Sequence, residues 1–420
     1  MNSGFFRSSG FFLFLSVINL LAGLGFGRFS MNAILPFMKE GLSLSYSQTG
    51  MVASSIFFGY LVSALLAGHL VIRSSPRTVI ITSLILLIVG ISGSAASFNF
   101  ASVLLSSILI GLGSGGVNVP NIGLVGRWFS ADRRGAALGV TNSGSSFGMI
   151  FSGFAIPWII TLHPEAGWRY SWLLLASITA AIAVFNLLWL RNAPDDPPQA
   201  GNTQNKQRPP IGREGMHLIE GNIYLDKTVW IIGVIYFTWG FSYLIFSTFF
   251  MDFLMHDAGF NKETAGYYLA AAGFGSIISG FIWGFVSDRL GRIQALFLIY
   301  IIQTALLLGF TFSRSSGLLL GETLLYAITL WAVPTIMVAA VNDLVQPLKV
   351  PVAVGFITLF FGAGQFFSPS VTGYLIDRAG SYEYAFLLSA GTCFTGALGL
   401  AGLLLSMKKP GLRAGTSADL

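Results

Sequence analysis

Residues 284–292 read Gly-Phe-Val-Ser-Asp-Arg-Leu-Gly-Arg and form a short polar turn in a very apolar part of the chain. Apolar runs flank this turn on both sides, at about 264–286 and 293–312. Each run has the length of roughly 20 apolar residues that a helix needs to cross a bilayer. The turn is therefore predicted to join two membrane helices at a membrane surface.

Further runs of the same kind bring the predicted number of spans to twelve, in two groups of six. The spans are expected at about 11–38, 47–71, 77–98, 100–125, 134–160, 169–190, 228–254, 264–286, 293–312, 316–341, 350–375 and 383–406. We therefore predict an all-α membrane protein with six-helix bundles at 1–190 and 228–407. The proline-rich, charged segment 191–227 is expected to be a solvated, partly disordered linker, and 408–420 a tail.

The composition excludes several classes of protein. Only 10% of the 420 residues are charged and 54% are hydrophobic, whereas soluble domains carry about 25% charged residues. A soluble enzyme is therefore excluded. A nucleic-acid binder is excluded despite the net charge of +6, because its basic residues would cluster on one face. The single Cys393 rules out disulfides and cysteine-based zinc sites. With no catalytic pair, phosphate loop or histidines at metal spacing, we expect no enzyme activity, metal or cofactor.

Basic residues are unevenly divided between the two predicted membrane surfaces. Seventeen Lys and Arg fall on the side that carries the linker and both ends of the chain, and five on the other side. Because short cytoplasmic loops carry an excess of Lys and Arg, we predict that both termini are cytoplasmic. The short loops and the absence of an Asn-x-Ser/Thr sequon favour a bacterial inner membrane.

The two halves of the chain repeat each other at an offset of about 215 residues. The sequence GFGR at 25–28 aligns with GFSY at 240–243, VPNI at 119–122 with VPTI at 333–336, and ALG at 137–139 with AVG at 353–355. Three matches in register indicate an internal duplication. Two parallel six-helix repeats are a known transporter architecture, in which the substrate binds between the halves near mid-membrane.

The turn at 284–292 resembles the cytoplasmic G-x-x-x-D-R-x-G-R signature of the major facilitator superfamily. In the equivalent turn at 68–77, Ile72 replaces the acid and Ser75 the second Gly. The twelve spans, the linker and the repeat extend the resemblance over the whole chain. It implies a cytoplasmic gate in which Asp288 holds the two halves together. The predicted gating residues are Asp288, Arg289, Arg292, Arg73 and Arg77. A tight turn with helix-end charges is the alternative.

Two further stretches bear on the branch of the superfamily. Residues 127–129 and 133–139 resemble the loop between the fourth and fifth spans in organic-anion and monocarboxylate branches. The first span departs from the monocarboxylate pattern, and its residues 27–29 and 35–38 are more similar to a bacterial branch. In the fifth span Met149 stands where the antiporter signature has Pro, which disfavours drug efflux.

Arg28 is the basic residue that no predicted loop accounts for. It lies about nine residues from the outer end of its span, hence ~13 Å at 1.5 Å per residue. An Arg placed centrally costs at least ~2.5–3.5 kcal/mol against lipid, so the side chain is expected to face a cavity or a partner. Its guanidinium can grip a carboxylate through two parallel hydrogen bonds, which predicts an anion site. Snorkelling to the outer interface is the alternative.

Glu322 is the acid expected to match Arg28, because it lies at a similar depth, ~12 Å into its span from Arg314. We predict a resting ion pair between Arg28 and Glu322. A carboxyl that is protonated when the substrate arrives would be the proton-coupling site. A structural acid near a helix end is the alternative.

Other polar and aromatic side chains in the central spans complete the predicted substrate site. Asn32 lies one helical turn from Arg28, and Tyr243 is the repeat-mate of Arg28. The predicted substrate-binding residues are Arg28, Asn32, Asn118, Asn121, Asn142, Tyr236, Trp239, Tyr243, Trp331 and Gln365. For each aromatic residue the alternative is packing or lipid contact, and for each amide a hydrogen bond between helices.

The sequence therefore predicts a monomeric secondary active transporter that imports a small organic anion by proton symport and alternating access. Its expected partners are the anionic substrate, protons and the lipid bilayer, with no nucleic acid. An exporter of amphipathic or cationic compounds is the alternative, which the aromatic residues favour and a buried Arg opposes. A transporter-like sensor without flux is a third hypothesis, which no feature of the sequence supports.

Overall fold

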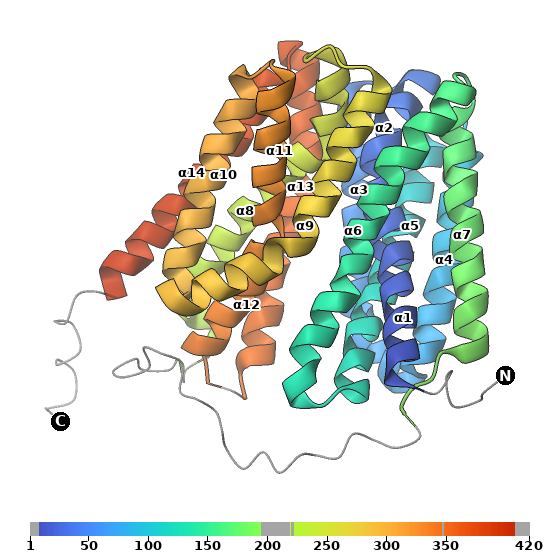
Figure 1. The fold of residues 1–420 in the computed structure, drawn as a ribbon. Coiled ribbons are helices and arrows are strands. Elements are labelled where there is room, and N and C mark those ends of the chain that lie inside the picture. Colours follow the sequence, from blue (N-terminus) through green and yellow to red (C-terminus); the bar gives the residue numbers. More distant parts are fainter. Residues whose placement is uncertain (1–7, 195–218, 220–221, 347, 408–420) are drawn as a thin grey trace, which may run out of the picture.

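The computed structural model describes residues 8–194, 219, 222–346 and 348–407. Within these residues, 12 helices are long and apolar enough to cross a membrane, at the predicted places. They form two six-helix bundles side by side, and both ends of the described chain lie on the same face (Figure 1). We call this face, the lower one in Figure 1, the terminal face and the other the opposite face. The predicted fold of twelve spans in two bundles is confirmed.

The helices of the first bundle precede those of the second in the chain. The first bundle consists of α1 (Ser9–Leu20), the π-helix η2 (Leu21–Phe29), α2 (Ser30–Gly41), α3 (Tyr46–Arg73), α4 (Pro76–Ala95), α5 (Phe100–Trp128), α6 (Ala131–Leu162) and α7 (Gly167–Trp189). The second consists of the short η3 (Ile223–Leu225), α8 (Lys227–His256), α9 (Lys262–Leu290), α10 (Arg292–Phe312), α11 (Ser316–Leu330), α12 (Ala332–Leu344), α13 (Val350–Ala379) and α14 (Glu383–Met407). Most of the predicted linker and the tail at 408–420 lie outside the described residues.

The polar turn at 284–292 is tighter than a separate loop. Helix α9 continues to Leu290 and α10 begins at Arg292, so that Gly291 alone separates them. Gly291 has a φ of 96°, a left-handed conformation that residues with a Cβ rarely adopt. The charged side chains of the signature therefore belong to the helix ends on either side of this glycine.

The first span changes its winding near the centre of the molecule, where Leu21–Phe29 form a π-helix. This geometry is rare and often marks functional sites. Gly25 crosses Gly148 of α6 so closely that a Cβ added to Gly25 would lie 2.8 Å from the Gly148 Cα. The second bundle repeats the crossing, because a Cβ on Gly364 of α13 would collide with the Phe237 carbonyl of α8. The glycines let these backbones approach each other directly.

Two equivalent helix pairs join the bundles, α3 with α13 and α6 with α9. Gly50 packs on the Pro369 carbonyl in the first pair, and Gly153 and Gly266 pack on each other in the second. Toward the terminal face the same helices diverge (Figure 1). There, an added Cβ would meet no atom within 4 Å at Gly68, Gly139, Gly284 and Gly355. The bundles are thus in contact near the opposite face and apart near the terminal face.

Candidate functional site

Arg28 lies in the last turn of η2 and reaches from the first bundle to the second. The residue is buried, with 9% of its surface exposed. Its guanidinium carbon lies 4.5 Å from the Phe57 ring centre and 4.7 Å from the Tyr60 ring centre, both on α3. Nη2 donates a hydrogen bond to the Tyr243 hydroxyl of α8 at 3.4 Å. Aromatic faces attract the cation electrostatically. The side chain is therefore held among protein groups and does not snorkel to the membrane surface.

The charge of Arg28 has no acidic partner among the residues that the structure describes. No described carboxylate forms an ion pair with it, and its Nε atom is buried without a hydrogen-bond partner. A buried charge is costly unless it is paired and hydrogen-bonded. The aromatic faces and one hydrogen bond offset only part of this cost. An anion would be the strongest partner for this position.

Gln365 of α13 and Asn118 of α5 extend the polar surroundings of Arg28. Gln365 Nε2 donates to the Tyr243 hydroxyl, and Asn118 Nδ2 donates to the Tyr60 hydroxyl at 2.7 Å. Asn118 Oδ1 is buried and has no hydrogen-bond partner within the described part of the chain. We call Arg28, Tyr60, Asn118, Tyr243 and Gln365 the central cluster. It combines a cationic donor with an unused carbonyl acceptor.

Aromatic side chains cover the second-bundle side of the central cluster. Trp239 stacks on Tyr243 with ring centres 4.5 Å apart, and Tyr236 stacks on Phe361 of α13 at 4.5 Å. Trp239 is fully buried, and its Nε1 donates to Gln303 of α10 at 3.1 Å. The predicted stripe is formed, but Trp239 is engaged in packing inside the second bundle. Of the three predicted aromatics on α8, Tyr243 is the one that is bonded to Arg28.

Asn32 and Trp331 lie close to the central cluster. Asn32 Nδ2 donates to Ser247 Oγ of α8 at 2.7 Å, which makes a further hydrogen bond between the bundles. The Trp331 ring packs edge-on against Phe29 with ring centres 5.5 Å apart, and its Nε1 is buried without a partner. The enclosed space beside Phe29 and Ser247 has a volume of about 10 Å³, roughly the room that one water molecule needs. An organic substrate does not fit there in this conformation.

Asn121 and Asn142 are not hydrogen-bonded to the central cluster. Asn121 is fully buried in the first bundle, where its Nδ2 donates to Ser16 Oγ at 3.0 Å and its Oδ1 accepts from Asn19 at 3.2 Å. These bonds join α1 and α5 and correspond to the helix–helix alternative. Asn142 is exposed on α6. The structure therefore separates both amides from the group around Arg28.

Glu322 does not pair with Arg28 in this structure, contrary to the prediction. Its Oε1 accepts a hydrogen bond from Ser313 at 2.9 Å, and its Oε2 is buried without a hydrogen-bond partner. The carboxyl packs on Gly309, so it lies between α10 and α11 within the second bundle. Two side chains at a similar depth do not meet when they face different sides of their helices.

The predicted gating residues of the second bundle are paired with one another. Arg292 forms ion pairs with Asp288 at 2.6 Å and with Asp343 of α12 at 3.5 Å. Arg289 lies over the Phe285 ring at 3.9 Å. All these partners belong to the second bundle. The family resemblance implies that Asp288 holds the two halves together when the gate is closed. In this conformation Asp288 does not join the two halves.

The first bundle shows the same separation at the terminal face. Arg77 donates to the Leu187 carbonyl of α7 at 2.6 Å, and Arg73 is exposed. Ile72, which replaces the acid of the signature, is 85% exposed. The predicted gating residues therefore lie where the two bundles are apart in this conformation.

The opposite face is fastened by polar contacts between the bundles. Asp377 of α13 accepts hydrogen bonds from the backbone amides of Tyr46 and Ser47 at 2.9 and 2.7 Å. These amides begin α3, and a carboxylate there satisfies free N–H groups and complements the helix dipole. In the equivalent helix pair, Thr161 of α6 donates to Glu263 of α9. The closed side of the molecule is therefore the opposite face.

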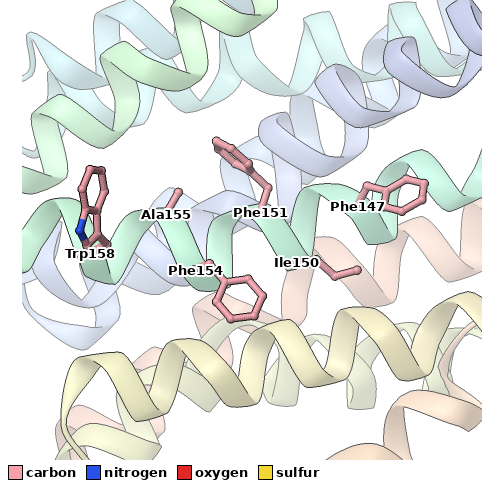
Figure 2. Close-up of a pocket in the computed structure, with 6 residues that line it drawn as sticks. All are labelled: Phe147, Ile150, Phe151, Phe154, Ala155 and Trp158. Carbon is pink, nitrogen blue, oxygen red and sulfur yellow. The ribbon is translucent and has the colours of Figure 1, made fainter.

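A separate apolar groove of about 490 Å³ runs along α6. Figure 2 shows its lining residues, which are Phe147, Ile150, Phe151, Phe154, Ala155 and Trp158. Three of them, Phe147, Phe154 and Trp158, are exposed. No member of the central cluster lines this groove, so we assign it to the lipid-facing surface.

Three aromatic residues of the site were not among those predicted. Phe361 lies four residues before Gln365 on α13, so helical periodicity could have found it. Phe57 and Tyr60 carry no comparable signal, because they lie in an apolar span without any predicted substrate-binding residue.

Comparisons with known proteins agree with the fold. A sequence model of the Major Facilitator Superfamily matches residues 15–333 and 250–419. The chain is 27% identical to the hexuronate transporter of Bacillus subtilis, over 97% of this chain and 96% of that protein. It is 23% identical to a probable sulfoacetate transporter of Cupriavidus necator, over 92% and 93% of the two chains. The crystal structure of the nucleoside transporter NupG superposes with a TM-score of 0.73 at 14% identity, over 93% of this chain and 98% of that one.

Proposed function

The chain belongs to the major facilitator superfamily, and on that premise we propose that this membrane transporter moves a small organic anion by alternating access between its two bundles. It is a transporter and not an enzyme. Of the two relatives named above, the Bacillus subtilis protein is a hexuronate transporter and the Cupriavidus necator protein is a probable sulfoacetate transporter. Both compounds are small organic anions, which supports the same substrate class for this chain.

The observation that carries this proposal is the buried, unneutralised charge of Arg28. Its Nε–H is left without a partner, and the residue lies where the two bundles meet. A carboxylate or sulfonate can accept two guanidinium N–H groups at once. A cationic compound would instead be repelled by Arg28, so the geometry favours anion transport over the export of cations.

The other polar groups of the site orient the proposed anion. Asn118 Oδ1 has an unused acceptor position, which a hydroxyl or amine near the acidic group of the substrate would fill. From the second bundle, the Tyr243 hydroxyl accepts a hydrogen bond from the guanidinium, and Gln365 donates to the same hydroxyl. Asn32 and Trp331 lie beside the cluster. The proposed substrate site consists of these five residues and of Arg28, which is the anion-binding group.

The proposed mode of transport is proton-driven import by a monomer in a bacterial inner membrane. The excess of basic residues supports a cytoplasmic position for the terminal face. The bundles then part on the cytoplasmic side in the conformation described here. Glu322 remains the proposed proton-coupling residue, because its buried Oε2 has no fixed partner and a carboxyl there can exchange a proton.

Uptake into proteoliposomes tests the proposed function. The purified full chain is reconstituted, a pH gradient is imposed, and the accumulation of labelled hexuronate, sulfoacetate and lactate is measured. We expect accumulation of at least one of these anions, and a reduction to the level of empty liposomes in Arg28→Ala. Arg127→Ala removes an exposed arginine outside the site and should leave uptake unchanged. If Arg28→Ala takes up each anion at the wild-type rate, the anion site is wrong.

A thermal-shift screen narrows the substrate class without a transport assay. The purified protein is heated with a library of carboxylates, sulfonates, amino acids and vitamins, because a ligand that binds the native state raises the midpoint of unfolding. Hydroxylated anions are expected to give the largest shifts. A library in which cations stabilise the protein and anions do not would favour the exporter instead.

A further inference from the structure

A histidine lies between the two bundles at the closed, opposite face. His256 is the last residue of α8, and its imidazole has a carboxylate on each side. Nδ1 lies 2.9 Å from Oδ1 of Asp252, one turn earlier in α8, and Nε2 lies 3.5 Å from Oε1 of Glu40 at the end of α2. Asp252 belongs to the second bundle and Glu40 to the first. The ring therefore bridges the two bundles.

The surroundings of the ring match a doubly protonated imidazole. Nδ1 also lies 3.1 Å from the Asp252 backbone carbonyl. Both nitrogens thus lie near carboxylate oxygens, and the hydrogen bond of Nδ1 is to the Asp252 backbone carbonyl. A neutral imidazole has one N–H and one lone pair, whereas the imidazolium has two N–H donors. In the neutral state one ring nitrogen would point a lone pair at an oxygen atom, so the bridge is complete only when His256 carries a proton.

We propose that His256, with Asp252 and Glu40, is a proton-binding site that holds the opposite face closed when the ring is protonated. This inference goes beyond the proposed function, because it applies whatever the substrate is and does not involve Arg28 or Glu322. The proton has access to the site, since the side chains of His256 and Glu40 are 40% and 60% exposed.

Of the two carboxylates beside the ring, Glu40 is the one whose ion pair requires a protonated His256, because Asp252 has other partners. Asp252 is already held by Lys39, whose Nζ lies 3.9 Å from Oδ2, and by a hydrogen bond from the Tyr382 hydroxyl. Burial, and after it the neighbouring Asp252, raises the pKa of the Tyr382 phenol, so this donor persists at neutral pH. Lys39 also lies 3.6 Å from the Tyr46 ring centre of α3. The contacts of Asp252 with Lys39 and Tyr382 therefore persist when His256 loses its proton. The ion pair between His256 and Glu40 is lost.

Three further charged groups at this end of the helices have other positions. Asp257 follows His256 in the chain, Arg314 lies over the Phe253 ring at 5.4 Å, and Asp377 is bound to the start of α3. None of these three forms an ion pair with His256 among the described residues. Lys39 is the nearby cation that opposes protonation of the ring, and two carboxylates favour it.

The sign of the effect follows from these contacts. Histidine is protonated below its ordinary pKa of about 6.5 and loses the proton as the pH rises through that range. At low pH the imidazolium joins Glu40 to the second bundle and favours closure of the opposite face. At high pH the bare Nε2 faces the Glu40 carboxylate, and opening becomes easier. The population open at the opposite face should therefore grow with pH.

Distances between spin labels across the opposite face test this site in the absence of substrate. Labels are placed at Glu165 and Glu383, one on each bundle, in the full chain in lipid nanodiscs. We expect the ratio of open to closed molecules to rise about fivefold or more between pH 5 and pH 8.5, within the usual range of coupling between sites. In His256→Gln most of this change with pH should be lost. In Glu40→Gln the change should be strongly reduced, and this exposed residue can be replaced without disturbing a core.

Two matched controls separate this site from other titrating groups. His163 is an exposed histidine beyond α6 on the same face, and His163→Gln should keep the full pH response. Arg28→Ala should also keep it, even if it abolishes transport, so that failure of the proposed function is distinguishable. A full pH response in both His256→Gln and Glu40→Gln, or its loss in His163→Gln, would overturn the proposal.

Discussion

Arg28 and Tyr243 occupy equivalent positions in the two repeats, 215 residues apart, and the guanidinium of one donates to the hydroxyl of the other at 3.4 Å. One turn further along, Asn32 donates to Ser247, and this pair is also 215 residues apart. Residues that meet their own repeat-mates lie where the axis relating the repeats passes. The sequences of the two repeats have diverged, so that this axis carries a cation from one repeat and a phenol from the other. The duplicated fold therefore has one polar site at its centre.

Arg28→Lys tests whether the substrate is held by the fork of the guanidinium. Lysine keeps the charge but cannot make two parallel hydrogen bonds to one carboxylate. A hydrogen bond to a charged group contributes about 1.5–3 kcal/mol, and about 1.4 kcal/mol is a factor of ten. We expect the KM for the transported anion to rise by about tenfold or more, measured from initial rates in proteoliposomes. An unchanged KM would show that the charge alone is sufficient.

The spans could be predicted to within a few residues because membrane thickness sets the length of an apolar helix. The gating turn could be placed for the same reason. The winding of the first span could not, because the π-helix at Leu21–Phe29 depends on the close crossing of Gly25 and Gly148. Such a crossing depends on both helices, so it cannot be predicted from the residues of one span alone.

The repeat supplied a second constraint for one residue of the predicted site, in addition to its place in a central span. Tyr243 was identified as the repeat-mate of Arg28, and the two are bonded. Glu322 was matched to Arg28 by depth, which leaves the direction of each side chain open. The same ambiguity applies to Asn118 and Asn121, which are three residues apart on α5. One bonds to Tyr60 beside Arg28 and the other to α1, because a small rotation about the helix axis separates them.

Asn118→Ala should change which anions are accepted. The mutation removes the free carbonyl acceptor beside the anion site, and a site that bonds a substrate hydroxyl discriminates strongly against analogues without one. We expect the preference for a hydroxylated carboxylate over its unsubstituted analogue to fall by about tenfold or more, measured as the ratio of kcat/KM values. Asn142→Ala, at an exposed amide outside the cluster, is the control and should keep the ratio.

Glu322→Gln separates proton coupling from substrate binding. The amide is close in size to the carboxyl and still accepts a hydrogen bond from Ser313, but it cannot carry a proton through the cycle. Accumulation driven by a pH gradient should be lost, while counterflow exchange of substrate across the membrane should remain. If the mutant accumulates substrate as well as the wild type under a pH gradient, Glu322 is not the proton-coupling residue. Its role is then structural, in joining Ser313 to α11.

Gly25→Ala should disturb the crossing on which the position of Arg28 depends. The new Cβ would lie 2.8 Å from the Gly148 Cα, and backbone rather than a flexible side chain is in the way. Overpacking of this kind costs typically about 1–3 kcal/mol. We expect a lower midpoint of thermal unfolding in detergent and reduced transport, because the π-helix must move to make room.

The matched control for this crossing is Gly139→Ala, on the same helix as Gly148. A Cβ at Gly139 would meet no atom within 4 Å, and alanine is favoured over glycine inside a helix by about 0.5–1 kcal/mol. Its unfolding midpoint should therefore equal or exceed that of the wild type. If the two alanine variants unfold at the same temperature, close backbone contact at Gly25 is not what sets the path of the first span.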